Sequence, residues 1–183
     1  MRKLLQFLLI LALGVFCCAC VNTFAVQELN QKAFDYMENG DIEAAISRFE
    51  ASIDLDGEIY ETRYNVGTAY VQIGKCQEAI PHLQKATTLK PKEPIAFYSL
   101  GVAAECAAKN IYITKDQNGR KIEKTFANPN EEKKAQENFV KNLNISIEAF
   151  ESYLKIVPNA EDAFRISDII KDSQKKIADI DKK

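Results

Sequence analysis

The feature that most constrains this chain of 183 residues is a set of positions that recurs every 34 residues. Gly40 and Gly74 are 34 residues apart, and each is followed by an alanine five residues later and an isoleucine six residues later. A second set of four positions also recurs after 34 residues. Its first occurrence is Tyr64, Val66, Gly67 and Ala69, and its second is Tyr98, Leu100, Gly101 and Ala103, in the same order. A fixed period of this length indicates units that bury their apolar sides by stacking on one another. We therefore expect three copies of one unit.

Each unit is predicted to be a hairpin of two α-helices. Between Tyr60 and Pro91, two amphipathic halves are separated by a short turn at Gly74. In the second half, apolar residues recur at steps of three and four, which places them on one helical face: Ala79, Ile80, Leu83, Ala86 and Leu89. Gly67 and Ala79 are small enough to let the two helices approach closely, and Pro91 cannot continue the second helix.

The middle unit carries the pattern of a known repeat family at these positions: Val66, Gly67, Tyr70, Gly74, Ala79, Leu83, Ala86 and Pro91. On these residues the chain resembles the tetratricopeptide repeat (TPR) proteins. Two positions depart from that pattern, because Arg63 replaces the first large aromatic and Gly57 stands where the first unit would have proline. The resemblance covers roughly two thirds of the chain. It implies an all-α fold, an α-α superhelix of about three helical hairpins with a C-terminal capping helix.

The expected organisation has four parts. Residues 1–25 form an export signal, residues 26–93 form TPR units 1 and 2, and residues 94–159 form unit 3, which an insertion at 109–141 interrupts. In residues 160–183, isoleucines alternate with charged residues in an amphipathic pattern that predicts the capping helix and a short tail. A terminal repeat needs such a polar outer face to remain soluble.

The insertion is predicted to contain a small β-hairpin and a lengthened second helix. Residues 111–114 and 121–125 alternate in polarity with the period of a strand, and Asn118-Gly119 between them favours a tight turn. A charged helical run begins at Glu131. We favour a surface excursion that has no role in binding. The alternative is that the hairpin covers or extends the repeat groove and helps to select a partner.

The first 25 residues have the composition of an export signal rather than of a folded domain. Arg2 and Lys3 precede an uncharged apolar run at 4–16, which is shorter than the roughly 20 residues that a stable membrane span requires. Cys17-Cys18-Ala19-Cys20 resembles a bacterial lipoprotein box in which Cys20 would be lipidated. Thr23-Phe24-Ala25 could instead be a cleavage site that releases a soluble protein, and an uncleaved anchor is the third alternative. All three place the repeats in the bacterial cell envelope, lipid-anchored or periplasmic.

Two cysteines, Cys76 and Cys106, lie outside the signal region. In stacked hairpins their positions fall at the same edge, so a disulfide could form in an oxidising compartment. We favour the simpler interpretation, in which both are small, partly buried apolar side chains.

Composition and motifs argue against catalysis and against nucleic-acid binding. The formal charge is −2, and it becomes −4 without Arg2 and Lys3, with no basic stripe. The single histidine, His82, has no nearby set of carboxylates and cysteines, and the chain has no phosphate-binding glycine loop or nucleophile elbow. We therefore expect no enzymatic activity, no metal, no cofactor and no small-molecule substrate.

The resemblance implies that the first helices of the units line a concave face. The residues on that face that are not needed for hairpin packing mix aromatics with amides, as a surface for an extended peptide or short helix would: Asn30, Phe34, Met37, Tyr64, Asn65, Thr68, Val71, Tyr98 and Val102. The alternative is that these side chains pack under the insertion or the capping helix. Some TPR proteins bind a C-terminal carboxylate with basic residues and asparagines on this face, but only Asn65 matches here.

Two functions follow from this sequence. The leading hypothesis is a protein-interaction scaffold of the cell envelope that binds a partner protein or peptide on the concave TPR face. The alternative is a structural accessory subunit of an envelope assembly or secretion complex, in which the helices are buried permanently.

Overall fold

The computed structural model describes residues 23–115, 120–180 and 182. Lipidation at Cys20 and a turn at Asn118-Gly119 are predictions that lie outside these residues. Across the described ranges, no helix is both long enough and apolar enough to cross a membrane. The chain divides into two compact units, one ending at Val66 and the other beginning at Gly67, and each is considered separately below.

The first unit is built from one helical hairpin and the start of the next. Residues 23–38 are helical and are followed by α2 (Ile42–Leu55) and α3 (Tyr60–Gln72), within which the division between units falls. Ala33 and Ala45 are fully buried, which lets Phe49 fill the space between the two helices. The Asp41 side chain accepts a hydrogen bond from the backbone N–H of Ala44 and so caps the start of α2.

The first and second helical hairpins of the repeat have the same backbone geometry at the turn between their two helices. Gly40 and Gly74 both have φ of +78°, a conformation that favours glycine. Each glycine N–H donates to the carbonyl three residues earlier, and the next residue donates to the carbonyl five residues earlier. The 34-residue repeat therefore recurs in backbone conformation as well as in sequence.

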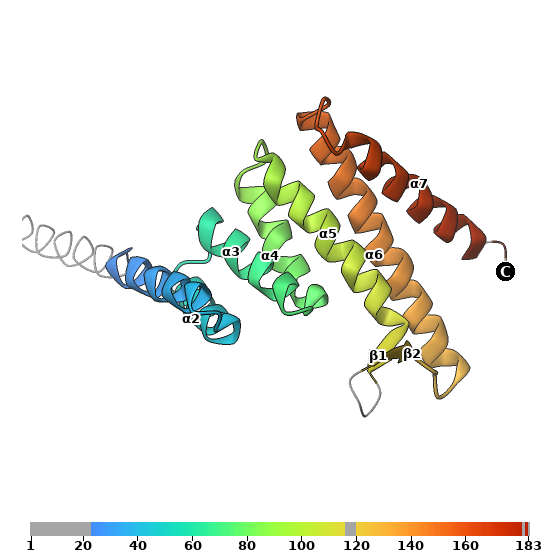
Figure 1. Ribbon diagram of the computed structural model, residues 1–183, viewed down its shortest axis with the longest axis horizontal. Coiled ribbons are helices and arrows are strands. Elements are labelled where there is room, and N and C mark those ends of the chain that lie inside the picture. The colour runs from blue at the N-terminus through green and yellow to red at the C-terminus, as the bar shows by residue number, and fades with distance from the viewer. Residues whose placement is uncertain (1–22, 116–119, 181, 183) are drawn as a thin grey trace, which may run out of the picture. The chain divides into compact units, whose positions relative to one another are not determined.

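The second unit is a stack of helices. It contains α4 (Cys76–Leu89), α5 (Pro94–Ile111), α6 (Pro129–Ile156) and α7 (Ala163–Ile180). Figure 1 shows α5, α6 and α7 lying side by side, with the two short strands at the end where α5 finishes and α6 begins. The predicted all-α fold of helical hairpins with a capping helix is confirmed.

Close helix packing depends on a glycine in each of the two later hairpins. A Cβ atom added to Gly67 would lie 2.6 Å from Cγ of Leu83, and one added to Gly101 would lie 2.7 Å from the ring of Phe150. The first pair lies 16 positions apart in the sequence and the second pair 49 positions apart. The third hairpin therefore has the same contact between a glycine and a large apolar side chain, although 33 additional residues lie between the two.

Those additional residues lengthen both helices and form a β-hairpin between them. Strands β1 (Ile113–Lys115) and β2 (Lys121–Glu123) pair antiparallel, with Thr114 opposite Ile122. The sequence placed Ile111 in a strand, and this was wrong: Ile111 is the last residue of α5. The pattern was ambiguous because a short apolar run can end a helix or begin a strand equally well.

Aromatic packing and a capped helix start hold the base of the hairpin. The ring of Tyr112 lies 5.8 Å from that of Phe126 and 5.3 Å from that of Phe139 on α6. At the start of α6, the Asn128 side chain accepts from the N–H of Glu131, whose carboxylate accepts from the N–H of Ala127. This arrangement satisfies backbone donors that a helix start leaves unpaired.

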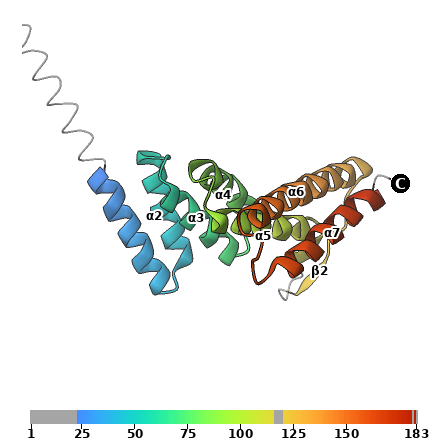
Figure 2. The same cartoon turned by 90° about the horizontal axis from the view of Figure 1, so that it is seen from above.

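Helix α7 covers α6 as the predicted cap. Its Ile166 and Ile170 are buried against Ile147 and Phe150 of α6, and Figure 2 shows α7 beside α6 from a second direction. The outer side of α7 carries charged residues, including an ion pair between Asp172 and Lys176.

Cys76 and Cys106 form a disulfide that joins the start of α4 to α5, with Cα atoms 5.8 Å apart. The favoured sequence interpretation, two unpaired apolar side chains, was therefore wrong. The repeat places both residues at one edge of adjoining helices, which is close enough for a disulfide. The Asn110 side chain donates to the carbonyl of Gly74 and to Sγ of Cys106 on the same edge.

Candidate partner-binding surface

In the first unit, three of the predicted binding residues form one stripe on the helix at 23–38. Asn30, Phe34 and Met37 are spaced at steps of four and three, which puts them on the same face. Phe34 is 41% exposed, although its ring contacts that of Phe49 edge to face at 5.6 Å. It therefore contributes to the hairpin core and still presents apolar surface to solvent.

A second stripe of this unit lies on α3. Tyr64 is half-buried and stacks on Tyr60, with ring centroids 5.9 Å apart and planes inclined by 11°. Asn65 beside it is also half-buried. Sequence analysis missed Tyr60, although its position one turn before Tyr64 on the same helical face was a usable signal.

A polar contact joins the first stripe to α3. The Asn30 side-chain amide donates a 2.9 Å hydrogen bond to the hydroxyl of Thr62, which is buried on α3. The Asn30 Oδ1 atom is also buried, but it has no hydrogen-bond partner within the part of the chain that the structure describes. A buried acceptor without a donor is destabilising.

A hollow of about 450 Å³ lies in the same unit next to Asn30. Its lining combines apolar and polar side chains: Thr23, Val26, Gln27, Asn30, Leu55, Asp56 and Ile59. Leu55 is 42% exposed, so the hollow offers an apolar wall. Among the lining residues, the sequence predicted only Asn30 for binding. It gave no signal for Leu55, Asp56 and Ile59, because these come from the end of α2 and the loop after it rather than from a first helix. We call the two stripes, Tyr60 and this hollow the aromatic–amide surface.

The remaining predicted residues lie in the second unit. Thr68 and Val71, on the last turns of α3, are half-buried. Tyr98 and Val102, on α5, pack against the cluster that α6 and α7 form through Phe150, Ile166 and their neighbours. For Tyr98 and Val102 the structure therefore supports the alternative considered above, in which they pack under the capping helix.

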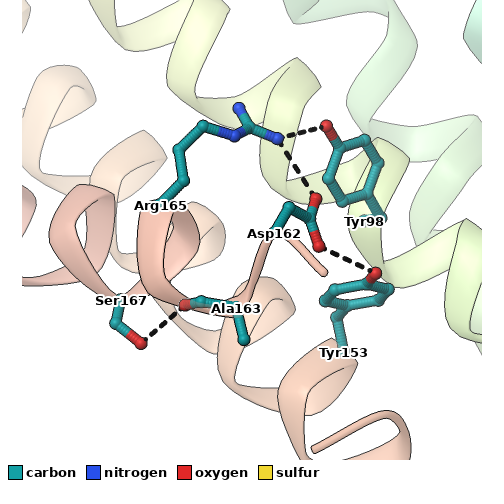
Figure 3. Close-up of polar contacts among 6 residues, drawn as sticks. All are labelled: Tyr98, Tyr153, Asp162, Ala163, Arg165 and Ser167. Carbon is teal, nitrogen blue, oxygen red and sulfur yellow. Dashed lines mark hydrogen bonds and ion pairs between the residues drawn. The ribbon is translucent and has the colours of Figure 1, made fainter. Parts of the chain in front are cut away.

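Polar contacts fix Tyr98 to α7, as Figure 3 shows. Arg165 donates to the hydroxyl of Tyr98 at 2.9 Å and to Asp162 at 3.1 Å, while the Tyr153 hydroxyl donates to Asp162 at 3.2 Å. Burial, followed by this hydrogen bond to Asp162, raises the pKa of Tyr153. The hydrogen bond to Tyr98 is the main cause that raises the pKa of Arg165. We call these four residues the α7 latch.

The one histidine has a packing environment. His82 is half-buried, and its ring stacks on that of Tyr70 with centroids 5.7 Å apart. Throughout residues 23–115, 120–180 and 182, no group of three or more histidine, cysteine, aspartate or glutamate side chains is arranged to hold a metal ion.

Sequence comparison identifies one segment of the chain with a known repeat. Residues 67–105 match the family model described as TPR repeat. This segment contains the end of α3, all of α4 and most of α5. No curated protein matches the sequence.

Solved structures of TPR domains share the fold at low sequence identity. The first TPR of Spaghetti (RPAP3), bound to the HSP90 peptide SRMEEVD, has a TM-score of 0.55 and 16% identity, and the match covers 84% of this chain and 93% of that one. The Yersinia enterocolitica type III secretion chaperone SycD, in complex with a peptide of the translocator YopD, has a TM-score of 0.53 and 17% identity, with coverages of 82% and 92%. MamA MSR-1 C2 has a TM-score of 0.57 and 18% identity, with coverages of 84% and 67%. These likenesses show a TPR-like fold, and the family match places the TPR repeat itself at residues 67–105.

Proposed function

We propose, from the TPR architecture that these findings support, that the chain is an exported scaffold that binds an extended peptide of a partner protein on the aromatic–amide surface. The observation that carries this proposal is the pairing of exposed aromatic area with a hollow that has apolar and polar walls, in one compact unit. Phe34 and the stacked Tyr60 and Tyr64 offer flat apolar area, and Asn30 and Asp56 give the hollow polar groups. Amphipathic aromatics and amides of this kind are enriched where proteins hold peptides.

The chemistry of the surface selects among peptides. The TPR structures described above include complexes with the HSP90 peptide SRMEEVD and with a YopD peptide. Here Asp56 and Asn30 bring acceptors to the hollow, and Lys32 on the same helix pairs with Glu28. An acidic peptide end would meet acceptors rather than donors. We therefore expect a peptide with an apolar side chain and N–H donors, including lysine or arginine, to bind instead.

Binding is tested by fluorescence anisotropy with two labelled peptides, one with alternating leucine and lysine and one ending in the acidic sequence EEVD. The first should bind and the second should not. Tyr64→Ala should weaken binding of the first peptide by roughly tenfold or more, as expected for an aromatic anchor. Phe164→Ala is the matched control, because Phe164 is an aromatic that is 79% exposed on α7. Equal binding by the wild type and Tyr64→Ala would contradict the assignment of the surface.

Export to the cell envelope is the second part of the proposal. The basic residues, the apolar run and the cysteines at the N-terminus support it, and so does the Cys76–Cys106 disulfide, because disulfides persist in oxidising compartments. Incorporation of labelled fatty acid that is lost in Cys20→Ala would demonstrate the lipid anchor. A chain that remains in the cytoplasm with free thiols would contradict export.

One observation favours the alternative function, a permanent accessory subunit. Tyr98 and Val102 lie beneath α7, so part of the expected groove is already occupied by this chain. A permanent subunit would purify only together with its partner and would not exchange added peptide. A chain that is soluble alone and binds peptide reversibly would support the scaffold.

A further inference from the structure

A groove runs along α6 on a side that the TPR interpretation does not use. It has a volume of about 730 Å³ and is lined mainly by one face of α6, from Lys133 to Glu148. Gln84 of α4 and Ile180 of α7 form its walls. All of these residues belong to the second unit, and none belongs to the aromatic–amide surface.

The floor of the groove is apolar and incompletely covered. Val140, Ile145 and Ile180 line it, and each is half-buried. The first part of α6 also extends beyond its neighbour α4, because Asn142 bonds to Gln77 in the first turn of α4. The turns of α6 before Asn142 therefore have no part of α4 beside them.

Four charged residues line the groove in alternating sign along α6: Lys133, Glu137, Lys141 and Glu148. None of the four forms an ion pair with another residue in the described part of the chain, although the first three are spaced at i, i+4. At the same spacing elsewhere in this unit, Glu105 pairs with Lys109 and Asp172 pairs with Lys176. The groove charges are therefore available to a partner.

We propose that a second copy of this chain occupies the groove, with the two α6 helices antiparallel across a two-fold axis. The lining residues run from 133 to 148, so an axis through their midpoint passes between Val140 and Lys141. That axis places Lys133 opposite Glu148 of the second copy, and Glu137 opposite its Asn144. Val140 then faces the aliphatic stem of Lys141, and no like charges face each other directly.

Self-complementarity distinguishes this occupant from others. In a two-fold interface each contact occurs twice, so a charged residue pairs across it when a residue of opposite charge lies at the same distance on the other side of the axis. With the axis at this midpoint, Lys133 and Glu148 pair in this way, whereas Glu137 and Lys141 face uncharged groups. A nucleic acid or an anionic lipid surface carries one sign of charge, and the two glutamates would offset the two lysines against it.

The test is sedimentation velocity of the full chain over a range of concentrations. The wild type should dimerise reversibly. Lys133→Glu and Glu148→Lys should each weaken the dimer by roughly tenfold, because each creates two like-charge contacts. Mixing the two variants should restore dimerisation, since both contacts are attractive in the heterodimer. Glu151→Lys is the control, because Glu151 is exposed on α6 outside the groove.

Three results would overturn the proposed dimer. A wild-type chain that stays monomeric at its highest soluble concentration would overturn the proposal, as would a dimer that neither variant weakens. Weakened variants that fail to recover on mixing would also overturn it. If a variant does not fold, hydrogen exchange of the wild type gives a second test, in which the amides of residues 133–148 should become more protected as concentration rises. The proposal is independent of peptide binding, so either can fail alone.

Discussion

The guanidinium of Arg63 donates a 2.9 Å hydrogen bond from Nε to the carbonyl oxygen of Gly57. These are the two positions at which the sequence departs from the TPR pattern. A Cβ atom at residue 57 would lie 2.6 Å from Nη2 of Arg63, so the guanidinium occupies space that a glycine leaves open. The two departures therefore compensate for each other. Arg63 stands at the position of the aromatic ring, and its guanidinium packs against Gly57, which stands at the position of the proline.

A double-mutant cycle on this pair tests the compensation. Arg63→Ala should lower the free energy of unfolding by about 1 kcal/mol, through loss of the hydrogen bond and of packing. Gly57→Ala should cost less, because only the flexible end of the arginine must move. The double variant should be less destabilised than the sum of the two single variants, as measured by urea unfolding. Strict additivity would show that the two positions act independently.

Gly101 should tolerate no larger side chain. An added Cβ would lie 2.7 Å from the Phe150 ring, which is buried and cannot move aside freely. Gly101→Ala should therefore cost about 1–3 kcal/mol of unfolding free energy. Gly57→Ala is a matched control in thermal unfolding, since the atom it meets belongs to the end of a flexible side chain. Equal melting temperatures for the two variants would contradict the packing argument.

Loss of the disulfide should destabilise the second unit. It closes a loop between residues 30 positions apart, so Cys106→Ser should cost about 3 kcal/mol by restriction of the unfolded chain. Urea unfolding with and without a reductant measures the loss for the wild type. The variant itself should be insensitive to the reductant. A wild type with the same stability in both conditions would contradict the pairing.

Removal of the α7 latch should loosen α7 before it unfolds the core. Tyr98→Phe removes only the hydrogen bond from Arg165, which is exposed, so its cost should be below about 1 kcal/mol. Tyr98→Ala also removes ring contacts with Phe150 and Tyr153 and should cost about 2 kcal/mol. Hydrogen exchange should rise in α7 in both variants and more strongly in Tyr98→Ala. Unchanged exchange in α7 would show that the latch does not hold it.

The α7 latch should also give stability a dependence on alkaline pH. The pKa of Tyr153 is raised in the folded chain, first by burial and then by its hydrogen bond to Asp162. Folding therefore favours the protonated phenol. This contribution is complete below the ordinary tyrosine pKa and is lost as pH rises through the raised value. The stability gap between the wild type and Tyr153→Phe should narrow over that range, and a constant gap would contradict this role.

The repeats could be predicted from sequence because their signal is local. Gly40 and Gly74 fix two turns through the same positive φ, and Gly67 and Gly101 mark the two close helix contacts. These constraints act within one hairpin, so a fixed period reveals them. The capping helix was predictable for a similar reason, since its apolar residues follow the helical period.

The candidate surface was less predictable because its residues are selected by neighbours distant in sequence. Whether Tyr98 faces solvent depends on Arg165, which is 67 residues away. The hollow beside Asn30 depends on Leu55, the last residue of α2, and on Ile59 in the loop after it, and neither position has a repeat signature. The pairing of Cys76 with Cys106 likewise depends on how two hairpins stack, so composition alone could not decide it.

The Cys76–Cys106 disulfide also determines how this chain would respond to mechanical tension. A force that pulls the two termini apart passes from Cys76 to Cys106 through the covalent bond and bypasses the 29 residues between them. Those residues, which include most of α4 and the first part of α5, cannot extend while the bond is intact. The fully stretched chain is consequently shorter by about 100 Å, at roughly 3.5 Å per residue. The bond therefore gives the middle of the repeat array a mechanically protected segment.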